Sequence, residues 1–247
     1  MWETQRIDLG GASAAAGLTI KAPWSPHQHC ALSIPRFIGR TEGEAFQLDQ
    51  VVNWSQDPQQ PDRVLFALDG DPGSTGVDFH GDVTLAEPDE AHVSLAMTNC
   101  SEQELKHGRH LIFLDLMKMP EFVDPTGVNT FYYTDAGWRC RADLFRDANV
   151  TDPSQAVRVG SHLGRTTVIW DVVARMDANR KHMIAFSLNR AFAFSSDHPD
   201  WGTGILAACR WNHLAPGERH YAMGIIYLLD ADLRQLEDRY IRNRKRR

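Results

Sequence analysis

Cysteine is scarce in this sequence, and its spacing fits neither a zinc site nor a disulfide scaffold. The chain of 247 residues has four cysteines, Cys30, Cys100, Cys140 and Cys209, and none of them form a C-x-x-C pair. A zinc knuckle is therefore not expected, and four cysteines are too few to staple a chain of this length. We expect them to act as small buried hydrophobic residues.

Long apolar runs and an excess of positive charge are also lacking. No stretch reaches 18 apolar residues, so no membrane span is predicted. Residues 1–6 lack the basic and apolar regions of a signal peptide, and we therefore expect a cytoplasmic protein. The formal net charge is −6, and no nucleic-acid partner is expected.

Several enzyme signatures are absent. The sequence has no G-x-S-x-G elbow, no G-x-x-x-x-G-K-[ST] loop, no H-E-x-x-H and no Rossmann glycine signature after a strand. These absences argue against phosphate-handling and nicotinamide chemistry.

Strand patterns, by contrast, recur along the whole chain. Residues 91–98 alternate between apolar and polar side chains, the period of a half-buried strand. Similar segments are found at residues 63–68, 77–85, 110–117, 166–176, 183–188 and 221–229. Many short strands separated by turn residues predict an all-β, antiparallel β-sandwich of the supersandwich type.

Helical spacing occurs at the C-terminal end. Asp232 is followed three residues later by Gln235, the spacing of a capping box, and apolar residues then recur on one helical face. The pattern predicts one C-terminal helix from about residue 232, packed across the sandwich or over its end.

Two irregular segments bear on the division into domains. Residues 47–63 are polar and contain proline, so we expect a loop there. Because strands continue on both sides of the irregular segment 147–161, we expect a single domain over residues 1–247.

A pair of histidines, His27 and His29, is the sharpest local cluster. In a strand the two imidazoles would share one face and could hold a divalent metal. The arrangement resembles the first half of a cupin metal motif, but no glutamate follows it among residues 30–36. A pair of loop histidines beside Trp24 is the alternative, and in that case no cofactor is expected.

Two further clusters combine titratable and aromatic side chains. In the segment 195–202, His198 is a candidate catalytic acid or base and Trp201 a stacking platform for a ligand. In the segment 209–213, Arg210 and Asn212 can form paired hydrogen bonds with sugar hydroxyl groups, Trp211 can stack on a sugar ring, and His213 is a second catalytic candidate. An ordinary turn and a polar edge strand are the respective alternatives.

The hairpin turn predicted at residues 134–138 places two more candidates, Trp138 and Arg139, on the following strand. We expect both to contribute to substrate binding.

A family resemblance follows from the turn Leu214-Ala215-Pro216-Gly217-Glu218 before a late strand, and from the strand at residues 93–101 that ends in Thr98-Asn99-Cys100-Ser101. Both resemble galactose-mutarotase-like β-sandwiches, over roughly residues 77–229. The resemblance implies a sandwich fold and a sugar ligand. The paired histidines and the C-terminal carboxylate base of aldose epimerases have no clear counterparts in this chain, so epimerase activity is not carried over.

Three functions remain open. The first is a protein that binds or processes carbohydrate, with acid–base chemistry of the epimerase, lyase or hydrolase type. The second is a binding or assembly module without catalysis, and the third is a metal-dependent enzyme using the H-x-H pair. The sequence does not separate a catalyst from a binder, and it leaves the oligomeric state unknown.

Overall fold

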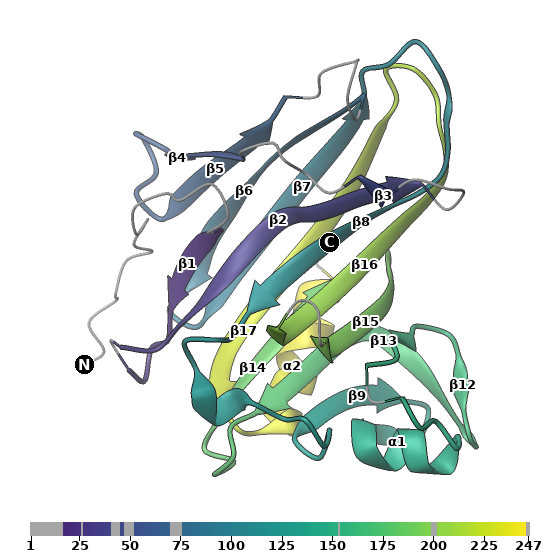
Figure 1. Ribbon diagram of the computed structural model, residues 1–247. Coiled ribbons are helices and arrows are strands. Elements are labelled where there is room, and N and C mark those ends of the chain that lie inside the picture. The colour runs from purple at the N-terminus through teal and green to yellow at the C-terminus, as the bar shows by residue number, and fades with distance from the viewer. Residues whose placement is uncertain are drawn as a thin grey trace.

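The computed structural model describes residues 17–25, 27–40, 45–46, 52–69, 76–152, 154–198 and 202–245. Within these residues the chain forms two β-sheets in which every strand pairing is antiparallel (Figure 1). The predicted antiparallel sandwich with a C-terminal helix is confirmed.

The seven-stranded sheet joins strands from both halves of the chain. Its order is β1 (Leu18–Lys21), β2 (His29–Arg40), β8 (Leu105–Asp115), β16 (Gly202–Leu214), β15 (Ala191–His198) and β11 (Val157–Arg158), with β3 (Ala45–Phe46) paired to β2.

The ten-stranded sheet forms the second layer. Its order is β10 (Gly137–Cys140), β9 (Thr130–Thr134), β13 (Thr166–Met176), β14 (His182–Leu188), β17 (Arg219–Asp230), β7 (Glu90–Asn99), β6 (Val77–Glu87), β5 (Arg63–Leu68) and β4 (Asn53–Gln56), with β12 (His162–Leu163) paired to β13. Strand β4 falls within the segment expected to be a loop, and that prediction was wrong because β4 pairs along the edge of β5.

The main apolar core lies between the two sheets. Alternation along each strand decides which side chains reach it. On β8, for example, Ile112 and Leu114 belong to this core, whereas Leu111 and Phe113 form a separate apolar cluster with Leu206. That second cluster therefore lies on the outward face of the seven-stranded sheet.

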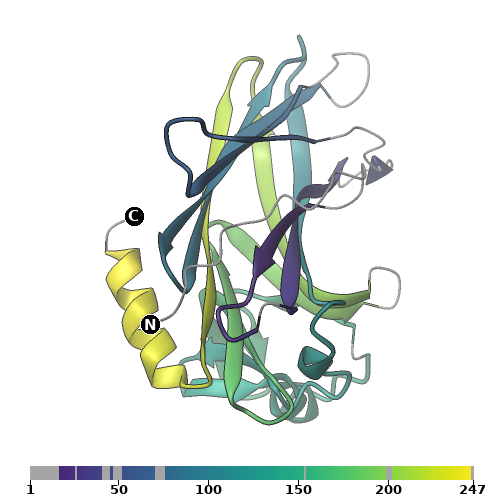
Figure 2. The same ribbon diagram turned by 90° about the vertical axis from the view of Figure 1, so that its left-hand side faces the viewer.

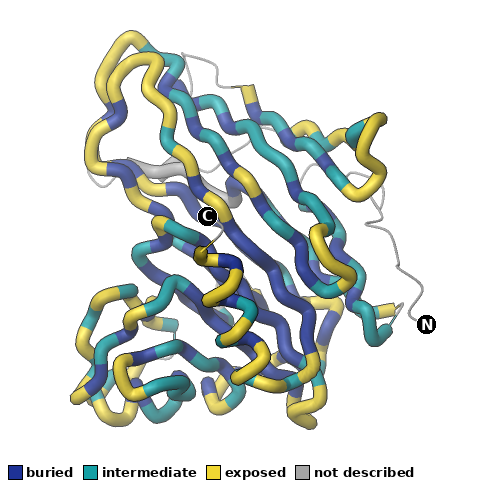
Figure 3. The backbone as a smooth tube through the Cα atoms, turned by 180° about the vertical axis from the view of Figure 1, so that it is seen from behind, coloured by how far each residue is buried: buried dark blue, intermediate teal, exposed yellow. Residues whose placement is uncertain are grey.

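A helix covers part of the outward face of the ten-stranded sheet. Helix α2 (Leu233–Arg244) lies across its outward face, where Leu236 and Tyr240 pack on residues of β13, β14 and β17 (Figures 2 and 3). The carboxylate of Asp232 accepts hydrogen bonds from the backbone N–H groups of Arg234 and Gln235, as expected of an N-cap. No helix in the described part of the chain is long and apolar enough to span a membrane.

Two short helical segments lie at the end of the sandwich opposite the β16–β17 turn. The 3-10 helix η1 (Pro120–Phe122) follows β8, and α1 (Arg141–Asp147) follows β10. The sequence did not predict α1, which is too short to show helical periodicity. Together with the connection from η1 to β9, these segments close that end of the sandwich (Figure 1).

Candidate functional site

The outward face of the seven-stranded sheet combines an apolar centre with polar ends. We call it the β8–β16 strip, and it consists of Arg109, Leu111, Phe113 and Asp115 on β8 and Gly204, Leu206, Ala208 and Arg210 on β16. Leu111, Phe113 and Leu206 are 4–6% exposed, although they do not belong to the core between the sheets. The strip therefore has a firmly packed centre.

Two arginines stand at one end of the strip. Arg210 is the direct cross-strand partner of Arg109, and both are exposed. The guanidinium carbon of Arg210 lies 5.5 Å from the ring centroid of Phe192, a cation–π contact. Asn212 is exposed further along β16. Two guanidinium groups and an amide can form several paired hydrogen bonds with a polar ligand.

A carboxylate stands at the opposite end of the strip. Asp115 is half-buried, lies opposite Gly204, and accepts a hydrogen bond from the backbone N–H of Met117 at 2.8 Å. Asp115 lies six positions after Arg109 along β8, so the two are roughly 20 Å apart. A ligand that contacts both must be longer than one sugar ring.

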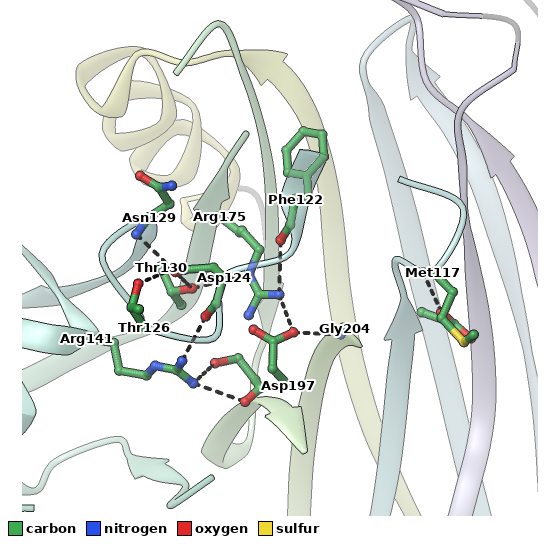
Figure 4. A network of polar contacts seen from close by, with 12 residues as sticks. Met117, Phe122, Asp124, Thr126, Asn129, Thr130, Arg141, Arg175, Asp197 and Gly204 are labelled. Atoms are coloured by element: carbon green, nitrogen blue, oxygen red, sulfur yellow. Dashed lines mark hydrogen bonds and ion pairs between the residues drawn. The ribbon is translucent and has the colours of Figure 1, made fainter. Parts of the chain in front are cut away.

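Behind this carboxylate end lies a buried ion pair between the sheets (Figure 4). Arg175 of β13 is fully buried, and its Nη1 donates to Oδ1 of Asp197 of β15 at 2.7 Å. The same Oδ1 accepts from the backbone N–H of Gly204 at 3.3 Å. Asp197 has a φ of 52°, in the left-handed region that non-glycine residues rarely adopt, so the surrounding contacts hold the backbone in a strained conformation.

A second arginine extends this network. Buried Arg141, the first residue of α1, donates to the backbone carbonyls of Asp124 and Ser196 and to the Ser196 hydroxyl. The Asp124 carboxylate accepts from the backbone N–H groups of residues 128 and 129 and from Thr130. The loop before β9 is therefore fixed to both sheets by charged hydrogen bonds.

Some polar atoms of this network are not satisfied. Nη2 of Arg175 and Oδ2 of Asp197 are buried without a hydrogen-bond partner among the residues that the structure describes. The hydroxyl of Tyr132 lies near Ser196 without completing a well-formed hydrogen bond, and burial raises the pKa of Tyr132 to about 12. Unsatisfied buried groups are uncommon and often accompany ordered water or a functional role.

The structure separates the two predicted catalytic histidines. His213 is exposed near the end of β16 and contacts Glu104, with 2.9 Å between Nδ1 and Oε1. The backbone of His198 pairs with Gly202 at the other end of the same strand. Gly202 and His213 are 11 positions apart along the strand, which is roughly 36 Å. The two candidates therefore stand near opposite ends of β16, and the catalytic role of each stays a prediction.

The predicted binding residues are also divided. Arg210 and Asn212 lie at the arginine end of the strip. Trp211 points the other way and is buried between the sheets beside His110, because successive residues of a strand face opposite sides. Its ring is therefore not presented to a ligand on the strip. Trp201 lies outside the described residues.

Trp138 and Arg139 lie on β10, at the edge of the other sheet. Trp138 packs edge-on against Tyr133 and belongs to the aromatic cluster beneath α2. Arg139 forms an ion pair with Asp147 of α1 at 2.9 Å. Neither residue joins the β8–β16 strip, so the structure does not bring them together with Arg210.

His27 and His29 lie at the β1–β2 turn, with His27 exposed and His29 half-buried. No group of three or more His, Cys, Asp or Glu side chains in the described ranges is arranged to hold a metal ion. Metal binding by this pair stays a prediction.

A neighbouring arrangement was missed by sequence reasoning. The ring of His182 stacks on Trp24, with centroids 4.5 Å apart, and its Nδ1 lies 3.3 Å from Oδ2 of buried Asp177. An aspartate orients an imidazole in this way in many catalytic sites. The sequence places Asp177 and His182 on either side of a short turn, and this spacing could have indicated the pair. Trp24 lies far away in the sequence, in the turn between β1 and β2, so its contact with His182 could not be predicted.

Comparisons with known proteins show similarity of fold. No family model matches the chain, and no curated protein matches it in sequence. An alpha-N-acetylgalactosaminidase, NagBb, from Bifidobacterium bifidum is 10% identical over 97% of this chain and 37% of its own, with a TM-score of 0.53. This chain therefore corresponds to little more than a third of that enzyme.

Two smaller solved structures cover more of their own length. A galactose mutarotase-like protein from Lactobacillus casei is 10% identical over 81% of this chain and 85% of its own, with a TM-score of 0.42. An aldose epimerase homologue from C. elegans is 8% identical over 90% and 84%, with a TM-score of 0.40. The resemblance to galactose-mutarotase-like proteins is confirmed as a weak one, at the level of the fold.

Proposed function

We propose that the protein binds a carbohydrate at the exposed arginine end of the β8–β16 strip, with Arg109, Arg210 and Asn212 reaching the ligand. The observation that carries this proposal is the cross-strand pair of Arg109 and Arg210. The pair lies beside the apolar cluster on the outward face of the seven-stranded sheet. The fold supports it too, because the similar glycosidase structure was solved as a complex with GalNAc.

The chemistry of the strip suits a sugar. A sugar offers hydroxyl groups on its rim, and such ligands are oriented by a few well-placed polar groups. The forked donors of Arg210 and the amide of Asn212 supply the polar contacts. Phe192, whose ring supports the Arg210 guanidinium, fixes the orientation of those donors.

Acid–base chemistry on the bound sugar would use groups at the carboxylate end. Asp115 lies there, and the backbone of His198 reaches the same end of β16. We propose these two as the pair to examine for epimerase, lyase or hydrolase activity. His213 lies at the arginine end, where it would contact a different part of an extended ligand.

Binding by defined glycans tests the proposal. The protein and its Arg210→Ala and Asn212→Ala variants would be screened against a glycan panel, and hits would be measured by titration calorimetry. Arg234→Ala provides a matched control, because Arg234 is exposed on α2, which covers the other sheet. We expect affinity to fall roughly tenfold in each strip variant, about the worth of one hydrogen bond, and to be unchanged in the control. Equal affinity in all four proteins would contradict the proposal.

A module without catalysis is the second candidate, because the outward face of the ten-stranded sheet carries exposed apolar residues beyond α2. Tyr221 is 57% exposed and Met223 is 42% exposed on the same face of β17. Protein partners favour exposed apolar patches of this kind. Size-exclusion chromatography of the wild type and of Tyr221→Ser/Met223→Ser tests it, and a strict monomer in both cases argues against self-assembly through this face.

A further inference from the structure

We propose that one water molecule is bound between the two sheets, held by Nη2 of Arg175, Oδ2 of Asp197 and the hydroxyl of Tyr132. This site is separate from the proposed carbohydrate site, which lies on the outward face of the seven-stranded sheet. The two proposals therefore stand or fall independently.

The placement of the three side chains is the first argument. Tyr132 of β9 pairs with Val173 of β13, and Arg175 lies two positions further along β13, so Tyr132 and Arg175 are diagonal neighbours on one face. That face packs against the other sheet, because Tyr132 and Val173 both belong to the core between the sheets. Burial has the largest effect on the pKa of Tyr132, but the charges of Arg175 and Asp197 also act on it, so its hydroxyl lies near both.

The incomplete ion pair is the second argument. Arginine and carboxylate groups frequently form two parallel hydrogen bonds. Here Nη1 of Arg175 donates to Oδ1 of Asp197 at 2.7 Å, and the same oxygen accepts from the backbone N–H of Gly204 at 3.3 Å (Figure 4). Nη2 and Oδ2, the other half of the pair, are buried and have no hydrogen-bond partner in the described part of the chain. An unpaired buried donor and acceptor are costly, so a molecule that bonds to both stabilises the fold.

The chemistry of the three unpaired groups determines what they can bind. Nη2 of Arg175 can only donate, the ionised Asp197 carboxylate can only accept, and the Tyr132 hydroxyl can do either. The carboxylate repels an anion and the guanidinium repels a cation, so the ligand is neutral and both donates and accepts. A buried water has these properties and typically makes about three hydrogen bonds. Because Arg175 and Tyr132 are at most 1% exposed, a ligand as large as a sugar ring does not reach these atoms.

The water extends the ion pair into a contact among three side chains from both sheets. It also helps to hold Asp197 in its left-handed conformation, with a φ of 52°. His198 follows Asp197 directly, and its backbone pairs with Gly202. The bound water therefore contributes to the position of the backbone at this end of β15.

High-resolution crystallography and oxygen-17 relaxation dispersion test the proposal, because the first locates ordered water and the second detects long-lived internal water in solution. The variant is Tyr132→Phe, which removes one of the proposed partners. Tyr133→Phe is the matched control, since Tyr133 is the next residue of β9 and donates to Glu237 at 3.0 Å. Circular dichroism verifies folding, and wild-type crystals soaked in sodium bromide reveal an anion site by anomalous scattering.

We expect a density peak within about 2.5–3.2 Å of all three atoms in the wild type and no bromide there. The dispersion amplitude should fall in Tyr132→Phe and stay unchanged in Tyr133→Phe. A direct bond between Nη2 and Oδ2 without a density peak, or an anomalous bromide peak between them, would overturn the proposal. An equal dispersion amplitude in the wild type and in Tyr132→Phe would do the same. If Tyr132→Phe does not fold, the wild-type crystals decide between these outcomes by themselves.

Discussion

Arg175 donates a hydrogen bond to Asp197 across the two sheets, with 2.7 Å between Nη1 and Oδ1. The arginine comes from β13 of the ten-stranded sheet and is fully buried, whereas the aspartate comes from β15 of the seven-stranded sheet and is 13% exposed. Charged groups taken out of water are stable only when they are paired. This contact therefore fixes the two sheets to each other beside the carboxylate end of the β8–β16 strip.

Replacing Arg175 by Met should destabilise the protein strongly. The substitution leaves the Asp197 carboxylate in a poorly solvated place without its cation, and removing one partner of a buried pair typically costs about 3–5 kcal/mol. Urea denaturation followed by circular dichroism measures the free energy of unfolding. Arg234→Met, on the exposed surface of α2, should change it by less than about 0.5 kcal/mol.

A second variant separates lost charge from lost packing. Adding Asp197→Asn to Arg175→Met removes the unpaired carboxylate, so the double variant should recover part of the loss. If Arg175→Met cost no more than the surface control, the pair would not be a buried ionic contact in solution.

Removing the N-cap of α2 by Asp232→Ala should cost about 1 kcal/mol, because the backbone N–H groups of Arg234 and Gln235 lose their acceptor. Asp232→Asn keeps an acceptor oxygen and should retain most of the stability. Chemical denaturation of the three proteins measures the difference, and equal losses in the two variants would show that the cap is not formed.

That cap illustrates what sequence alone can reach. Asp232 and Gln235 are only three residues apart, so the sequence alone shows their spacing. The alternation of a strand also extends over a few residues, and the limits of β5 and β13 were therefore predicted to the residue. Local chemistry and local periodicity do not depend on the rest of the fold.

The candidate site depends on contacts that no local pattern contains. Arg210 and Trp211 are adjacent in sequence, yet one lies on the outward face and the other in the core. The partner of Arg210 is Arg109, about a hundred residues earlier in the chain. Which face of a strand is covered depends on the assembly of the sheets, and this is why the predicted histidines and tryptophans could not be sorted in advance.

The contact between α2 and the β6–β7 turn should make stability depend on acidic pH. Burial alone would raise the pKa of Glu90, but hydrogen bonds from His92, Asn243 and Arg239 lower it to about 2. The unfolded chain binds the proton first, near pH 4.5. The stabilisation is therefore complete above that pH and is lost as the pH falls toward 2.

A shift of this size implies that about 2 kcal/mol of stability is lost by pH 3. Denaturation of the wild type and of Glu90→Gln from pH 7 to pH 3 measures the effect. The variant should be less stable at pH 7 and should show a flatter pH dependence, whereas Glu87→Gln, at an exposed position on the same turn, should follow the wild type. Parallel curves for Glu90→Gln and wild type would contradict the assignment.

His110 should behave unlike an ordinary core residue. It is fully buried between Phe79 and Trp211, and in the described part of the chain neither ring nitrogen has a hydrogen-bond partner. Burial, with a smaller contribution from His220, lowers its pKa to about 3. The native state therefore holds a neutral imidazole whose polar atoms were taken from water without compensation, which typically costs about 1–3 kcal/mol.

His110→Leu removes that cost together with the ring contacts, so at pH 7.5 we expect a change within about 1 kcal/mol. Truncating buried Phe79 to Ala should instead cost about 3–5 kcal/mol. The distinguishing result lies at lower pH. Because the unfolded chain takes up a proton near pH 6.5 and the folded chain does not, the wild type should lose about 2 kcal/mol between pH 7.5 and pH 5.0 through this group, and the variant should not. If urea denaturation showed the same loss in both proteins, the imidazole would have to be hydrated or hydrogen-bonded in solution, and the core at this end of the sandwich would have to contain water.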